Sequence, residues 1–189
     1  MGVIAALASL WPGEAAAQVR WDLGVEGGPE GRVLTGKPAG GPDSGFGPAV
    51  EAQAHVALFP LLRLGPYVQY DTSPVSGLGV RGIFSAGLDA RVLMPWPRGA
   101  IRAYVRAAVG EAATLEFDGR GAPGGHFTEV PLAIGAAARV APWTWVTSEV
   151  GARPGFAFGG AAYHPPSARS SPGNDTLAVY LTLGLLVGR

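Results

Sequence analysis

The sequence predicts an all-β chain folded as an eight-stranded antiparallel up-and-down barrel, and three observations lead to that prediction. Apolar and polar residues alternate with a period of two along most of the chain. No internal segment is apolar over a length that would form a membrane-spanning helix. Along the chain, short connections between these segments mostly alternate with long ones. Side chains of a strand point to opposite faces, so each such segment has one apolar and one polar face.

The alternation is clearest in residues 50–58, where Val50, Val56 and other apolar residues alternate with Glu51 and His55. A helical period of 3.6 does not fit this segment. The same pattern along the rest of the chain predicts strands at residues 19–27, 47–59, 62–71, 80–94, 101–109, 127–141, 144–156 and 177–187.

The connections differ in length in a way that is typical of membrane barrels. Tight turns are expected at Pro60, at residues 95–99 and around Pro142, whereas residues 28–46, 111–126 and 157–175 form long connections rich in Gly, Pro and Ser, and residues 72–79 are intermediate. Transmembrane barrels have short periplasmic turns and longer extracellular loops. We therefore expect strands that cross a membrane.

Aromatic residues gather near both ends of the expected strands, as in the aromatic belts of membrane proteins. The residues expected at the interface of the short-turn end are Trp21, Trp96, Trp143 and Trp145, and those near the long loops are Phe46, Tyr70, Phe117, Phe127 and Phe156.

Composition limits the possible functions. The formal net charge is zero, so there is no basic surplus for nucleic acid. The chain has no Cys, which excludes disulfides and Cys-ligated metal sites. The three His residues are far apart without ligand spacing, and we expect neither a metal nor a cofactor.

The N-terminus has the pattern of an export signal. Residues 3–11 are a short apolar run, and Ala15, Ala16 and Ala17 resemble a small-residue cleavage site, so residues 1–17 are expected to be a signal peptide and residues 18–189 a single barrel domain. Because no Lys or Arg precedes the run, either the true start lies upstream or this is a buried or disordered segment.

The architecture, together with residues 61–68 and the apolar alternation of residues 177–187, resembles the small eight-stranded outer-membrane β-barrels of Gram-negative bacteria, the OmpA-like, OmpX-like and opacity-type proteins, in a myxobacterial form. The resemblance covers the whole chain after the signal. It implies location in the cell outer membrane, contact with outer-membrane lipid, and insertion by the barrel-assembly machinery.

The polar face supplies the charges of a filled lumen. Folding the strands about their turns places Asp89 opposite both Arg63 and Arg106, and Asp71 opposite Arg81, which predicts a row of ion pairs. The complete lumen charge network expected, with a structural role, is Arg63, Asp71, Arg81, Asp89, Arg91, Arg102, Arg106, Glu129, Arg139, Glu149 and Arg153.

The predicted function is a structural or surface-interaction role without catalysis, in which the barrel anchors and the long loops reach an extracellular ligand. Two alternatives remain: a small pore or transport accessory, and a soluble exported barrel whose apolar face turns inward around a small apolar ligand. His126, Ser73, Ser76 and Asp118 are candidates for a rim active site, but no motif connects them. His55 is expected to be a satisfied lumen residue.

Overall fold

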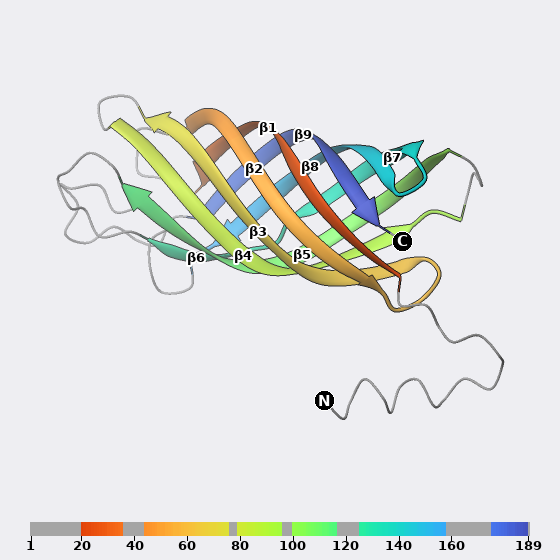
Figure 1. Cartoon of the computed structure of the whole chain (residues 1–189). Helices are drawn as coiled ribbons and strands as arrows, with labels where there is room; N and C mark the ends of the chain where they lie inside the picture. Colours follow the sequence, from red (N-terminus) through yellow and green to blue (C-terminus); the bar gives the residue numbers. More distant parts are fainter. Residues whose placement is uncertain are drawn as a thin grey trace.

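The computed structural model describes residues 20–35, 44–75, 79–95, 100–116, 125–157 and 175–188. These residues form one antiparallel sheet that closes on itself (Figure 1). Its strands are β1 (Trp21–Thr35), β2 (Ser44–Ala57), β3 (Leu62–Val75), β4 (Gly79–Leu93), β5 (Ile101–Glu116), β6 (His126–Glu129), β7 (Leu132–Ala141), β8 (Thr144–Phe156) and β9 (Asp175–Gly188).

The barrel has eight strand positions, because β6 and β7 occupy one of them. Both pair with β5 on one side and with β8 on the other, in a single register. Pro131 has no N–H and interrupts the ladder, but its carbonyl accepts from the Ala108 amide at 2.8 Å, and the Val130 amide donates to the Pro154 carbonyl at 2.9 Å. The sixth predicted strand, 127–141, is therefore present with an interruption, and the predicted eight-stranded barrel is confirmed.

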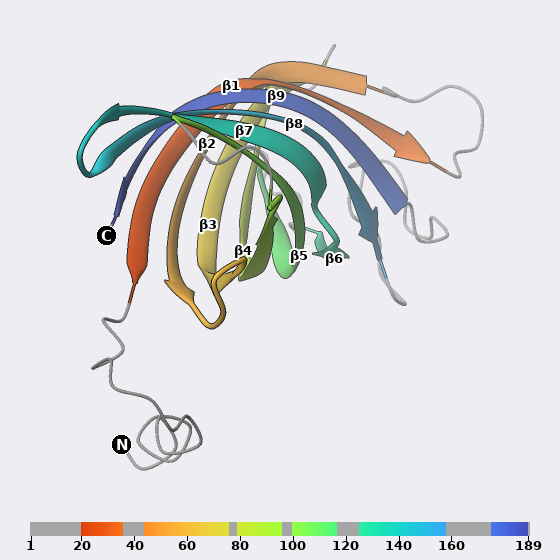
Figure 2. The same cartoon turned by 90° about the vertical axis from the view of Figure 1, so that its right-hand side faces the viewer.

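The strands are strongly tilted. A path through paired residues that leaves β1 at Gly24 and crosses every strand position once returns to β1 at Leu34, ten residues further along. Such a stagger corresponds to a tilt of roughly 35–45°. Figure 2 shows the strands curving around a common interior.

Short turns lie at one end of the barrel, where β1 begins and β9 ends (Figure 1). Residues 58–61 and 142–143 join β2 to β3 and β7 to β8 there. At the opposite end, β1, β3, β5 and β8 end and β2, β4, β6 and β9 begin.

The strands extend further toward the long connections than the alternation predicts. β1 continues to Thr35 and β5 to Glu116, where loops were expected from residues 28 and 111. Gly28 lies so close to the Leu181 carbonyl oxygen that a Cβ would approach it to 1.9 Å, so only glycine fits in this part of the ladder. The Gly27-Gly28-Pro29 stretch thus resembles a loop in sequence and yet belongs to a strand.

The two faces of the barrel are opposite in polarity. Leu23, Val25 and Leu183 point outward and are more than half exposed, whereas Glu26 and Asp89 point inward and are almost fully buried. A soluble barrel with the apolar face inward is therefore wrong: the apolar face is the outer surface. No helix in the described part of the chain is long and apolar enough to cross a membrane.

Candidate functional site in the barrel interior

Four buried arginines lie inside the barrel, each on a different strand. Arg32 is on β1, Arg91 on β4, Arg106 on β5 and Arg153 on β8, and all are at most 3% exposed. Each sits at an inward position of the two-residue alternation, so the sheet fixes its direction. Burial of a guanidinium requires close carboxylate partners, because desolvation of an unpaired charge is costly.

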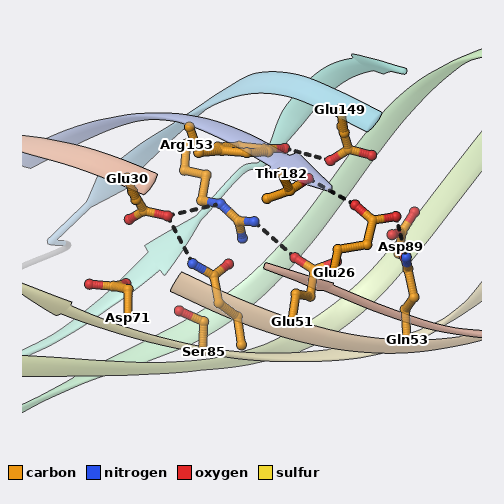
Figure 3. A network of polar contacts seen from close by, with 12 residues as sticks. Glu26, Glu30, Glu51, Gln53, Asp71, Ser85, Asp89, Glu149, Arg153 and Thr182 are labelled. Atoms are coloured by element: carbon orange, nitrogen blue, oxygen red, sulfur yellow. Dashed lines mark hydrogen bonds and ion pairs between the residues drawn. The ribbon is translucent and has the colours of Figure 1, made fainter. Parts of the chain in front are cut away.

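Shared carboxylates join these arginines into one continuous series. Glu30 contacts Arg32 at 2.9 Å and Arg153 at 3.6 Å, and Glu51 contacts Arg153 at 2.8 Å and Arg106 at 2.6 Å. Figure 3 shows Arg153 between Glu30 and Glu51.

Glu149 completes the series, since it contacts Arg106 at 2.9 Å and Arg91 at 3.5 Å. Positive and negative groups therefore alternate along the interior. We call this series the lumen chain, and its members are Arg32, Glu30, Arg153, Glu51, Arg106, Glu149 and Arg91.

Each arginine of the lumen chain also lies over an aromatic ring, at 4.3–5.6 Å from the guanidinium carbon to the ring centroid. Stacking on a ring face supports a desolvated guanidinium beyond what its carboxylates supply. The pairs are Arg32 with Phe127, Arg91 with Tyr104, Arg106 with Tyr67 and Arg153 with Tyr180.

Strand glycines make room for these rings. Tyr104 is the direct cross-strand partner of Gly135, and Tyr180 that of Gly151. A Cβ on Gly135 would lie 2.3 Å from the Tyr104 ring, and one on Gly151 would lie 2.6 Å from the Tyr180 ring. The rings therefore lie flat over glycine and fill the lumen beneath the arginines.

Further polar groups satisfy the ends of the lumen chain. Toward the long connections, Arg32 also pairs with Glu129 at 2.6 Å and Asp71 at 3.3 Å. Toward the short turns, Glu26 accepts from Gln53 at 2.8 Å and Thr182 at 2.9 Å (Figure 3).

A second small cluster lies at the short-turn end of the interior. His55 Nδ1 is 2.9 Å from Asp22, and His55 Nε2 is 3.5 Å from Asp89. Arg63 forms an ion pair with Asp22. His55 is 2% exposed, and its ring lies between the carboxylates of Asp22 and Asp89.

The structure places the sequence-predicted charges in three groups. Asp71, Asp89, Arg91, Arg106, Glu129, Glu149 and Arg153 are buried in the interior. Arg63 is partly buried, Arg102 and Arg139 are exposed at the short-turn mouth, and the Arg81 side chain lies outside the described residues.

The predicted row of directly opposed charges is wrong in register. Asp89 is opposite Gly65 and Ala108, Arg63 is opposite Arg91, and Arg81 is opposite Ser73 and not Asp71. The Asp89–Arg106 ion pair nevertheless forms diagonally, at 2.6 Å, because long side chains reach across a two-residue offset. The expected partnership of Arg63 with Asp89 is replaced by its pair with Asp22.

Two of the predicted interface aromatics point inward instead. Trp145 is 8% exposed and Phe127 only 2%. Each lies an even number of residues from an inward carboxylate on its strand, Glu149 for Trp145 and Glu129 for Phe127, and therefore points to the same face. Trp21, Phe46 and Phe156 do face outward, Trp143 is exposed in the short turn, and Tyr70 is half-buried. Trp96 and Phe117 lie outside the described residues.

Sequence reasoning missed several interior residues of the network. Glu30 and Arg32 fell in a segment assigned to a loop. They lie an even number of residues from the inward-facing Asp22 and Glu26, so the alternation continues through them. Tyr67, Tyr104 and Tyr180 alternate with apolar neighbours on strands that were recognised, and this alternation was the available signal. Thr147 and Thr182 were missed as well. The structure buries His55 in the interior, as the sequence indicated, together with residues that the alternation assigned to the polar face but that the predicted network left out: Asp22, Glu26, Glu51, Gln53, Gln69 and Ser85.

Across the described ranges, no group of three or more His, Cys, Asp or Glu side chains is placed to hold a metal ion. Of the rim candidates for catalysis, His126 is exposed at the start of β6, and Asp118 and the Ser73 and Ser76 side chains lie outside the described residues.

Comparison with known proteins supports the fold. A solved structure of Neisserial surface protein A matches with a TM-score of 0.66 at 12% identity, covering 88% of this chain and 96% of that chain. The outer membrane protein OprG from Pseudomonas aeruginosa matches with a TM-score of 0.50 at 11% identity, covering 89% of this chain and 95% of that chain. No protein-family model and no curated protein matches the sequence. The fold is that of the small outer-membrane β-barrels.

Proposed function

We propose that this protein resides in the bacterial outer membrane, where its closed barrel is a rigid anchor that presents the long connections at the cell surface for interaction. One observation carries the proposal: an outer surface formed mainly by exposed apolar side chains surrounds an interior crossed by the lumen chain. An exposed apolar surface this extensive is unfavourable in water and favourable in lipid.

The surface role follows from the position of the connections. Short turns face the periplasm in proteins with this architecture, and longer loops face outward. Residues 36–43, 117–124 and 158–174 then lie at the cell surface, on a scaffold whose strands are all hydrogen-bonded to two neighbours. Binding residues are commonly found on loops held by a rigid scaffold. The partners proposed are outer-membrane lipid, the barrel-assembly machinery, and an extracellular ligand of the loops.

The lumen chain argues for a closed interior and against the alternative function of a pore. Eight strands leave an interior just wide enough for side chains, and here arginines, carboxylates and rings occupy it from Arg32 to Arg91. A conducting pore requires a continuous water path, which these contacts interrupt. We propose no catalytic role.

Epitope insertion tests the location and the orientation. A tag inserted within residues 158–174 is expected to be labelled on intact cells, whereas a tag between Pro142 and Trp143 is expected to be labelled only after permeabilisation. Labelling of the second tag on intact cells, or recovery of the protein in the soluble fraction, would contradict the proposal.

Planar bilayers test the closed lumen. The wild type is expected to give no conductance steps, and the variant with Arg32→Ser, Arg106→Ser and Arg153→Ser is expected to give them, because serine vacates the interior along most of the lumen chain. Steps of equal size in both proteins would favour the pore. A shift in gel migration on heating shows that each protein is folded.

A further inference from the structure

A cavity of about 420 Å³ opens at the short-turn mouth of the barrel. Its wall is unusually basic for this molecule, in which the formal net charge is zero. Arg20, Arg63, Arg102 and Arg139 line it, and Trp143 and Trp145 form an aromatic side. Cavities of this size commonly hold small organic ligands.

Two of these arginines converge on one ring. The Arg102 guanidinium lies 4.4 Å from the centroid of a Trp145 ring, and that of Arg139 lies 5.9 Å from it. Arg139 is also held by the Ala141 and Pro142 carbonyls, to which it donates at 3.3 Å and 2.8 Å. The turn therefore fixes the direction of one guanidinium, and the ring positions both.

The mouth lacks the charge pairing that is found throughout the interior. Every arginine of the lumen chain contacts at least two carboxylates. By contrast, no carboxylate of the described residues lies within ion-pair distance of Arg20, Arg102 or Arg139. The cavity wall also includes Arg63 and Arg91, which do have such partners: Arg63 pairs with Asp22, a lining residue that also contacts His55, and Arg91 pairs with Glu26 and Glu149.

Like charges held close together without counter-charges are unfavourable, and an anion between them relieves the repulsion. Guanidinium groups bind phosphate through paired N–H donors, and several of them can share its oxygens. A phosphate occupies only part of 420 Å³, which leaves space for an attached organic group against the exposed Trp143 and the partly buried Leu186.

We propose that this cavity binds a phosphate ester, with the phosphate held by Arg20, Arg102 and Arg139 and its organic part against the aromatic side. The site rests on the proposed function only for the compartment it faces, the periplasm. The phosphate belongs either to a soluble solute or to a lipid headgroup of the inner leaflet, and the two sources are separable by experiment.

The test uses the folded protein in dodecyl maltoside, a detergent without phosphate. Glycerol 3-phosphate and short-chain phosphatidylglycerol are titrated separately, with calorimetry and tryptophan emission as readouts, since Trp145 lies beside the site. Binding of the first identifies a soluble ester, and binding of the second alone identifies a lipid headgroup. Either result supports the site.

Three variants make the test specific. The double variant Arg102→Gln with Arg139→Gln is expected to weaken binding at least tenfold. The variant with Arg102→Lys and Arg139→Lys, which keeps the charge and loses the paired donors, is expected to fall between it and the wild type. Trp21→Phe, which lies on the outer face and outside the cavity wall, is the control and is expected to bind as the wild type does.

Binding of neither ligand, or equal binding by the wild type and the Gln variant, would overturn the proposal. In that case the mouth arginines only balance the acidic interior, and the Gln variant would be less stable without a change in binding. Heat-dependent gel migration of the same samples reports separately on the barrel, so a failed site is distinguished from a failed membrane fold.

Discussion

Substitution of Arg106 tests most directly whether the buried ion pairs stabilise the barrel interior. Its guanidinium lies 2.6 Å from Glu51, 2.6 Å from Asp89 and 2.9 Å from Glu149, and it is 3% exposed. Arg106→Gln leaves these three carboxylates without their common partner. Removal of one member of a buried ion pair costs about 3–5 kcal/mol, and we expect a loss in this range because protonation of one carboxylate limits the cost.

Arg102→Gln is the matched control, because the same side chain is removed from the same strand at an exposed position. Its expected cost is about 0–1 kcal/mol, as for exposed charges. The assay is reversible urea unfolding in lipid vesicles, followed by tryptophan emission. If the two variants differ by less than about 1 kcal/mol, the interior is wetter than the contacts indicate, and the reasoning fails.

A double variant isolates the Arg106–Asp89 contact from general loss of packing. Asp89 contacts only Arg106 and His55 among the charged groups of the described interior. Arg106→Gln combined with Asp89→Asn is expected to cost less than the sum of the two single variants by about 1–3 kcal/mol. Strict additivity would show that the pair contributes no interaction of its own.

Three further predictions concern the faces of the barrel. Gly135→Ala, which places a Cβ 2.3 Å from the Tyr104 ring, is expected to cost about 1–3 kcal/mol in urea unfolding, while Gly31→Ala, which meets only an ordinary contact, is nearly neutral. Leu183→Arg, on the outer face, is expected to cost about 2–4 kcal/mol in vesicles, the cost of a charge in lipid. The quenching of tryptophan emission by brominated lipid is expected to decrease less after Trp145→Phe than after Trp21→Phe, because of these two residues Trp21 faces outward and Trp145 faces inward.

Each of these has a contradicting result. An equal cost for both glycine variants would mean that the ring moves freely, and a neutral Leu183→Arg would mean that lipid does not cover this face. Equal loss of quenching would place Trp145 at the lipid interface, as the sequence had suggested.

The period of two was sufficient to predict the barrel and the direction of most side chains. Glu51, Asp89 and Glu149 were separated from their apolar neighbours by parity alone, because a strand has only two faces. The same parity places Trp145 and Phe127 inside, so their assignment to the interface was an error of interpretation and the pattern itself was correct.

The two-residue alternation could not predict two features, the register between strands and the full length of β1. Register depends on the turns and on the hydrogen-bonded ladder, so a shift of two residues at the β4–β5 connection moves Asp89 from Arg106 to Ala108 without changing either face. Strand length was underestimated at Gly28 and Pro29, where glycine accommodates close approach of β9, and this concealed Glu30 and Arg32.

Oxygen accessibility of spin labels along β9 tests the central claim, the direction of the two faces, most directly. The chain has no native Cys, so Cys can be introduced singly at residues 178–183 and 185 for study in vesicles. We predict that labels at the outward positions collide freely with oxygen and not with a water-soluble nickel chelate, whereas labels at the inward positions are shielded from both. The outward positions are Val179, Leu181, Leu183 and Leu185, and the inward positions are Ala178, Tyr180 and Thr182. Chelate access at the outward positions, or loss of the two-residue alternation, would contradict the account.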